Sequence, residues 1–163
     1  LIGATYLVPN AIFQRVLQPK IYSWATDAPQ MIRKLYIQGS LVMAGLGLAI
    51  GLFTWVVCEI LILTIFGPEY AQSVNITIIL VFAIPFTYVS YFFGAILFTR
   101  HSFGIKIVIM GTVAAFNIAA NAYAIPAFGA TGAALTTVAS SVLLCGLYCE
   151  AVRRRLKADR LAA

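Results

Sequence analysis

The sequence predicts an all-α protein, a polytopic transmembrane helix bundle. Hydrophobic residues make up 62% of its 163 residues and charged residues only 10%, whereas about a quarter of the residues in soluble domains are charged. Four apolar stretches are each long enough to cross a bilayer, which takes about 20 residues of helix. The connections between them alternate between basic and non-basic. The predicted spans cover residues 37–66, 73–99, 105–125 and 133–152.

The first 17 residues form an apolar run that Pro9 and Asn10 interrupt. Because this run is short for a span and opens without Met, we interpret residues 1–17 as the end of a truncated transmembrane helix. The expected bundle is then four full spans plus a partial N-terminal one. A cleaved signal peptide is the alternative, but its basic residues should precede its apolar core, and here Arg15 and Lys20 follow it.

Residues 18–34 are predicted to form a cytoplasmic connector. Within it, Asp27 is expected to cap a helix that has Pro29 in its first turn, the position that proline tolerates best. This helix feeds into the first full span. A four-helix transmembrane bundle is therefore expected over residues 35–152, followed by a basic cytoplasmic tail over residues 153–163.

The distribution of basic residues predicts the orientation of the bundle. All eleven Lys and Arg residues lie on one side of the zigzag: before the first span, around the 100–104 connection, or after the last span. By the positive-inside rule this side is cytoplasmic, so the turns at 67–72 and 126–132 face outward. We expect a multi-pass protein of the plasma membrane, in contact with the lipid bilayer, with a cytoplasmic C-terminus. Since topology explains the net charge of +6, we expect no nucleic-acid partner.

The first span is unusually long and contains Glu59. Its thirty residues correspond to about 45 Å of helix, against roughly 30 Å of hydrocarbon. If the crossing uses the early part of the span, Glu59 lies at the outer interface. If the crossing is centred later, Glu59 is buried and is a possible coupling carboxylate. We favour the interfacial position, because the other spans offer no deep counter-charge.

Pro85 interrupts the second span and is predicted to kink it, since proline removes a helical hydrogen bond. Such a kink can serve as a hinge. Among the aromatic residues that follow, Tyr88 and Tyr91 are the pair expected to turn inward, because each hydroxyl needs a partner. They are candidates for lining a substrate cavity, with lipid contact as the alternative.

Asn117 and Asn121, four residues apart, project from one face of the third span. Small residues surround them, so the amides either bridge helices that pack closely or line a substrate cavity; we favour packing. Gly47 and Gly51 form a small-xxx-small motif in the first span, which we interpret as an ordinary helix contact.

We expect no catalytic residues, no metal site and no cofactor. The three cysteines all lie within predicted spans, where a thiol behaves as a small apolar group. No sequence cluster combines His, Cys and carboxylates in the way that an active site or a metal centre requires. The cysteines are Cys58, Cys145 and Cys149.

Several segments follow one another in an order that is informative. Phe-Gly-Pro-Glu-Tyr at 66–70 ends a long span; a proline-containing span, a basic turn and the two asparagines follow; then come Ile-Pro-Ala-Phe-Gly-Ala-Thr-Gly-Ala-Ala at 125–134 and Thr136-Thr137. Near the start, Gln-Pro-Lys-Ile-Tyr at 18–22 closes a helix. This series resembles the C-terminal portion of bacterial polysaccharide (O-antigen type) flippases, in the multidrug/oligosaccharidyl-lipid/polysaccharide exporter superfamily.

The resemblance implies a transporter of two pseudo-symmetric bundles, of which this chain is the last part of the second. Its partner would be the missing N-terminal bundle of the same protein. Its substrate would be a lipid-linked glycan, an undecaprenyl-diphosphate-linked oligosaccharide, moved by alternating access. Since the spans hold no deep cation, the diphosphate site lies upstream, or Arg15 and Arg100 reach in from the inner rim.

Other functions remain open at this point. Within the same superfamily, the alternatives are a cation-coupled drug exporter and a peptidoglycan-precursor flippase. A different class is a membrane scaffold subunit without transport activity.

Overall fold

The computed structural model describes residues 29–97 and 103–161, with side chains over 36–97 and 103–157. This part of the chain is all-α, as predicted. Its elements are α3 (Pro29–Phe66), a short 3-10 helix η2 (Pro68–Tyr70), α4 (Ala71–Val81), α5 (Ala83–Ile96) and α6 (Phe103–Leu161). The predictions for residues 1–17, for Asp27 and for the phosphate candidates Arg15 and Arg100 lie outside the described residues.

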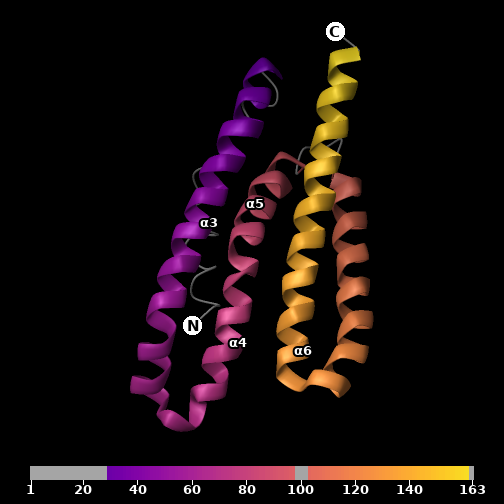
Figure 1. Cartoon of the computed structure of the whole chain (residues 1–163). Coiled ribbons are helices and arrows are strands. Elements are labelled where there is room, and N and C mark those ends of the chain that lie inside the picture. The colour runs from indigo at the N-terminus through magenta and orange to yellow at the C-terminus, as the bar shows by residue number, and fades with distance from the viewer. Residues whose placement is uncertain (1–28, 98–102, 162–163) are drawn as a thin grey trace.

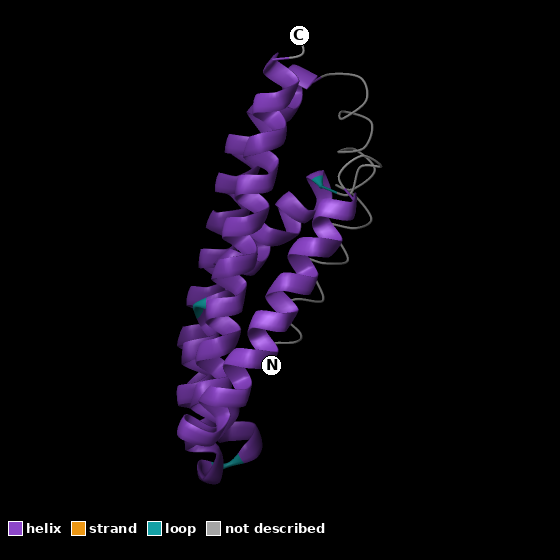
Figure 2. Ribbon diagram, turned by 90° about the vertical axis from the view of Figure 1, so that its right-hand side faces the viewer, coloured by secondary structure: helices purple, strands orange, loops and turns teal. Residues whose placement is uncertain are grey.

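The helices run up and down a bundle with two distinct ends (Figure 1). The chain reverses after α3 at Gly67, whose φ of 91° lies in the left-handed region, and α4 and α5 return along α3. α6 then runs back down and doubles back at Gly129, so that its two legs lie side by side (Figures 1 and 2). We call the end with these two reversals the turn end and the opposite end the basic end.

Two helices are long and apolar enough to cross a membrane: α3 over Tyr36–Phe66 and α6 over Phe103–Lys157. The bent pair Pro68–Val81 and Ala83–Ile96 adds a third span if it is counted as one. α6 is a single element although it reverses, so its two legs occupy the places of the third and fourth predicted spans. The length and composition of these helices suit contact with a lipid bilayer.

α3 packs through one stripe of residues and exposes the rest. Its 38 residues make about 57 Å of helix, longer than the hydrocarbon layer. The buried positions recur every three or four residues, as one helix face requires, while large aliphatic side chains elsewhere on α3 are exposed. The buried face carries mostly small residues: Gly47, Gly51, Thr54, Cys58 and Ile62.

The second predicted span is broken rather than continuous. α4 ends at Val81, α5 begins at Ala83, and the two helices are bent by 41° at Phe82. The cause is local, because Pro85 has no N–H to donate to the Val81 carbonyl four residues earlier. The predicted proline kink is therefore present, and it is sharp enough to divide the span.

The structure differs from the predicted loop at 126–132. Helical backbone continues through Pro126, and only Gly129 departs from it, with φ 58° and ψ −137°. Glycine reaches this conformation without steric cost, so one residue suffices to reverse the chain. At its other end α6 continues to Leu161, so the described part of the basic tail is helical.

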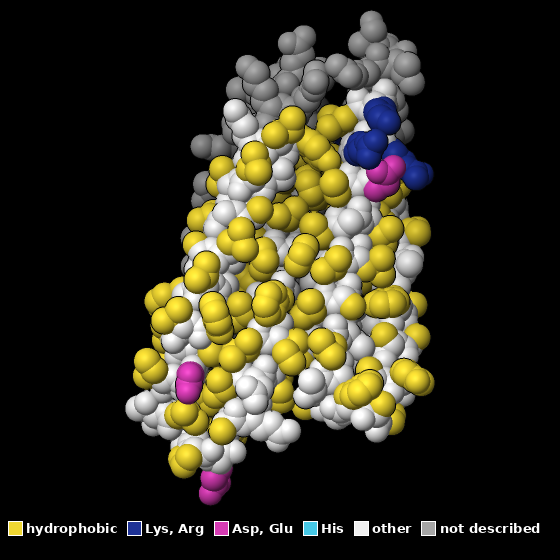
Figure 3. Space-filling view, viewed as in Figure 1, with side chains coloured by type: hydrophobic (Ala, Val, Ile, Leu, Met, Phe, Trp, Pro, Cys, Tyr) yellow, Lys and Arg dark blue, Asp and Glu magenta, His cyan; other side chains and the backbone are white. Residues whose placement is uncertain are grey.

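Two hydrophobic clusters hold the helices together. The larger lies toward the basic end, where α5 meets both legs of α6, and includes Phe92, Leu97 and Val152. The smaller, of Cys58, Ile62 and Val74, joins α3 to α4 near the turn end. On the face seen in Figure 3, Lys and Arg side chains gather where α6 finishes, with one acidic group among them, and the other acidic side chains lie toward the turn end. The gathering of the Lys and Arg side chains seen here at one end agrees with the one-sided basic pattern of the sequence.

Candidate functional site

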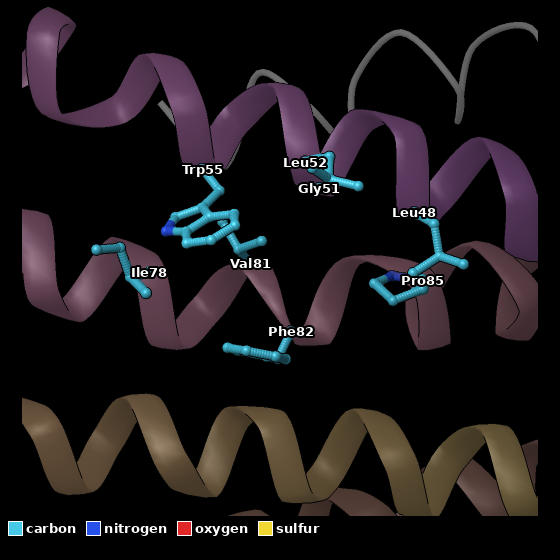
Figure 4. Close-up of a pocket in the computed structure, with 8 residues that line it drawn as sticks. All are labelled: Leu48, Gly51, Leu52, Trp55, Ile78, Val81, Phe82 and Pro85. Atoms are coloured by element: carbon cyan, nitrogen blue, oxygen red, sulfur yellow. The ribbon is translucent and has the colours of Figure 1, made fainter.

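An apolar groove opens at the break between α4 and α5, about halfway along the bundle (Figure 4). Its volume is about 230 Å³. α3 forms one wall and the broken span forms the other; Trp55 lies toward Ile78 and Val81, and Leu48 lies over Pro85. No polar side chain lines it. The lining residues are Leu48, Gly51, Leu52, Trp55, Ile78, Val81, Phe82 and Pro85.

Two glycines set the distance between the walls of this groove. A Cβ atom on Gly47 would lie 2.6 Å from the Cα of Pro85, a separation that real side chains do not adopt. A Cβ on Gly51 would lie 3.5 Å from Cγ1 of Val81 and 3.7 Å from its carbonyl oxygen. The small-xxx-small motif therefore makes a helix contact, as interpreted from the sequence. The two glycines of the motif pack against the break between α4 and α5.

This contact covers the weakest part of the backbone. The Val81 carbonyl, which Pro85 deprives of its helical donor, lies against Gly51 on α3. In a bilayer, non-helical backbone is tolerated only where protein or a water-filled cavity covers it. Gly51 lets α3 approach closely enough to provide that cover.

Tyr88 and Tyr91, predicted to line a cavity, do not line this groove. Tyr88 is only 2% exposed and lies one helical turn before Phe92, whose ring end faces Gly39 of α3. Tyr91 is half-buried. A role for either residue toward a substrate stays a prediction.

Asn117 and Asn121 form a polar ladder with Thr136 and Ser140 between the legs of α6. Asn117 Nδ2 donates to Ser140 Oγ at 2.8 Å, and Asn121 Nδ2 donates to Asn117 Oδ1 at 2.9 Å. The Thr136 hydroxyl donates to Asn121 Oδ1 at 2.5 Å. These bonds join the two legs of α6, as the helix-packing interpretation of the two asparagines requires. Among the described residues, no buried side-chain nitrogen or oxygen lacks a hydrogen-bond partner.

Replacing Thr136 by valine tests whether the ladder stabilises the hairpin. The change removes the bond to Asn121 at nearly constant volume and is expected to lower the free energy of unfolding by about 1 kcal/mol. Thr137→Val is the matched control, because the exposed Thr137 hydroxyl donates to the Ala133 carbonyl, as the Thr136 hydroxyl also does, but makes no bond to the other leg. Unfolding in detergent measures the difference. Equal stability of the two variants would contradict a packing role.

Glu59 lies on the exposed surface of α3, outside the groove. It is seven residues before the end of the helix, about 10 Å from the turn end at 1.5 Å per residue. Its neighbours Cys58 and Ile62 pack against Val74 in the first turn of α4. These neighbours place the carboxylate near the level at which α4 begins.

The ammonium group of Lys106 is a feature that the sequence did not indicate. Its Nζ lies 3.8 Å from the position that a Cβ on Gly94 would take, and the Tyr148 ring approaches the same position to 3.2 Å. The side chain is half-buried between α5 and α6 at the basic end. In the sequence, Lys106 is only a cation at the start of a span. Its inward position depends on Gly94 of α5, whose missing side chain leaves room for the ammonium group.

The cysteines do not gather with other ligand types. Cys58 is buried against α4, and Cys149 Sγ lies 3.1 Å from the hydroxyl of Tyr36. Within 29–97 and 103–161, no group of three or more His, Cys, Asp or Glu residues could hold a metal ion.

Comparison with known proteins adds no family to this picture: no family model, no curated protein and no solved structure matches the chain. The fold and the groove define a class, a bundle of apolar helices able to cross a membrane, with one span broken at mid-height.

Proposed function

We propose that this chain is the C-terminal part of a transporter that flips lipid-linked oligosaccharide across the bacterial plasma membrane for polysaccharide biosynthesis. The observation that carries the proposal is the broken α4–α5 span, closely packed on α3 through Gly47 and Gly51. Broken helices at mid-membrane are typical of secondary transporters, where they border the substrate path and allow one part to move against another. The order of motifs between Phe66 and Thr137 supports this particular class.

The groove and the basic end suit different parts of such a substrate. The groove is lined only by apolar side chains, which suits a hydrocarbon chain rather than a glycan. Lys106 is half-buried at the basic end, where a phosphate group would enter from the cytoplasm. In this scheme the bend at Phe82 is the hinge, and the missing N-terminal bundle supplies the other wall of the pathway.

Deleting the gene that encodes this chain tests the proposal. The expected result is loss of surface polysaccharide together with accumulation of the undecaprenyl-diphosphate-linked oligosaccharide, measured by mass spectrometry of extracted lipids. Normal surface glycan combined with new sensitivity to cationic drugs would instead identify a drug exporter. Normal glycan without drug sensitivity would leave the peptidoglycan-precursor flippase and the scaffold subunit, and accumulation of the lipid-linked peptidoglycan precursor would identify the former.

Pro85→Ala tests the hinge in the complete protein. Alanine can donate its N–H to Val81, so the span should straighten while the protein remains folded and abundant. Export of glycan per folded molecule should fall. Undiminished export would remove the broken span from the mechanism.

Glu59→Gln is expected to leave export unchanged at every pH, because an interfacial carboxylate takes no part in proton coupling. Export is measured by surface glycan in cells with an imposed proton gradient, and Glu69→Gln in η2 is the matched control. A folded Glu59→Gln variant without export would show that Glu59 is a coupling site and that the membrane boundary lies nearer the turn end.

A further inference from the structure

The last turns of α6 carry a basic face that points away from the bundle. Val152 is fully buried and Leu156 packs against the same core, which fixes one side of the helix. Arg153, Arg154 and Lys157 are exposed on the other side. α6 continues beyond Val152 to Leu161, about 13 Å at 1.5 Å per residue, and stands clear of the end of α5 (Figure 1).

The carboxylate of Glu150 forms ion pairs with two of these cations. Arg154 Nε donates to Glu150 Oε1 at 2.8 Å, and Arg153 Nη1 lies 3.8 Å from Glu150 Oε2. The side chains of Arg153 and Arg154 are nonetheless 61% and 79% exposed. A guanidinium has five N–H donors, so one carboxylate leaves most donors of both arginines open to another acceptor.

We propose that this face, formed by Arg153, Arg154 and Lys157, binds the phosphate groups of anionic phospholipids in the adjoining leaflet. A guanidinium can grip two oxygens of one phosphate at once, which a simple point charge cannot do. Long basic side chains next to a membrane span keep their charged ends at headgroup level. Polybasic segments at this position attract anionic lipids at the surface.

The position of the face selects lipid as the source of the phosphate. The buried residue Val152 belongs to the apolar bundle, and the cations begin at the very next residue. They therefore lie where the helix leaves the hydrocarbon, which is the depth of lipid headgroups in any orientation of the bundle. The inference does not depend on the proposed transport function.

Replacing Glu150 is predicted to change lipid binding in the opposite direction from replacing the arginines. Its carboxylate offsets part of the positive charge of the same two guanidiniums that a lipid phosphate would bind, so it weakens their attraction for the phosphate. Removing the arginine charges should weaken lipid binding, whereas removing the Glu150 charge should strengthen it. A general loss of stability cannot produce both effects.

The experiment compares phosphatidylglycerol with phosphatidylcholine. The 163-residue chain is purified in detergent, both lipids are added, and native mass spectrometry measures their relative binding. The variant Arg153→Gln/Arg154→Gln/Lys157→Gln should lose preference for phosphatidylglycerol, by roughly fivefold for each cation removed. Glu150→Gln should raise the preference above that of the unsubstituted chain. Both differences should shrink as salt is added.

Controls distinguish lipid binding from misfolding and from the binding of a soluble phosphate. Arg153→Lys/Arg154→Lys keeps the charge but loses the two-point grip, so its preference should lie between those of the unsubstituted chain and the triple variant. Helical circular dichroism of each variant in phosphatidylcholine checks the fold, and the substituted side chains are exposed. An unchanged preference in the triple variant would overturn the proposal. Displacement of phosphatidylglycerol by millimolar inorganic phosphate or diphosphate would assign the face to a soluble phosphate ligand and overturn it as well.

Discussion

Gly132→Val is expected to disrupt the α6 hairpin and to cause a large loss of stability. A Cβ at this position would overlap the carbonyl oxygen of Ala124, which belongs to the backbone of the opposite leg and cannot move aside. Overpacking of this kind costs about 1–3 kcal/mol and sometimes more. Thermal unfolding in detergent and the abundance of the protein in membranes measure the effect.

The control for Gly132 lies on the same leg. Gly146 is exposed, and a Cβ there meets nothing within 4 Å. Gly146→Val therefore reports the cost of a β-branched residue in the helix without the overlap. If the two variants unfold at the same temperature, the legs of α6 do not approach each other closely at Gly132.

Gly47→Ala is expected to separate α3 from the broken span and to lower the free energy of unfolding by about 1–3 kcal/mol. The added methyl group would lie 2.6 Å from the Cα of Pro85, so a helix has to shift. Gly45→Ala is a close control, since a Cβ at Gly45 is free of contacts within 4 Å. It should be neutral or slightly stabilising, because alanine favours helix over glycine by about 1 kcal/mol.

A second measurement separates contact at the break from a general effect of alanine. In the double variant Gly47→Ala/Pro85→Ala, the two changes should be non-additive, because the residues touch. Additive losses would mean that Gly47 does not pack on the break. In the complete protein, Gly47→Ala should also reduce glycan export, since the groove and the hinge share this contact.

The parts of the fold that depend on local chemistry could be predicted from the sequence. Helix α3 ends at Phe66 because Gly67 supplies a left-handed turn, and the second span bends because Pro85 lacks a donor. The i, i+4 spacing of Asn117 and Asn121 predicted that they share one helix face. In the structure this face is hydrogen-bonded to Thr136 and Ser140.

The parts of the fold that depend on packing between residues far apart in the chain could not be predicted from the sequence. A helix that is apolar on all sides, such as α3, gives no pattern that selects its buried face; only its glycines mark it. The groove therefore appears only when Gly47 and Gly51 meet Pro85 and Val81. The reversal of α6 at a single residue was equally hidden, because Pro126 and the small residues around it suggested a longer loop.

The ladder within α6 has a consequence for how the chain enters a membrane. An unpaired carboxamide in hydrocarbon costs several kcal/mol, yet the two asparagines find their partners within the same hairpin, at most 23 residues away in sequence. We expect the legs to insert together as one unit during synthesis, with their amides already shielded from lipid. Assembly with α3 and α5 then buries mainly apolar surface, with the contact between Tyr36 of α3 and Cys149 of α6 as a polar addition.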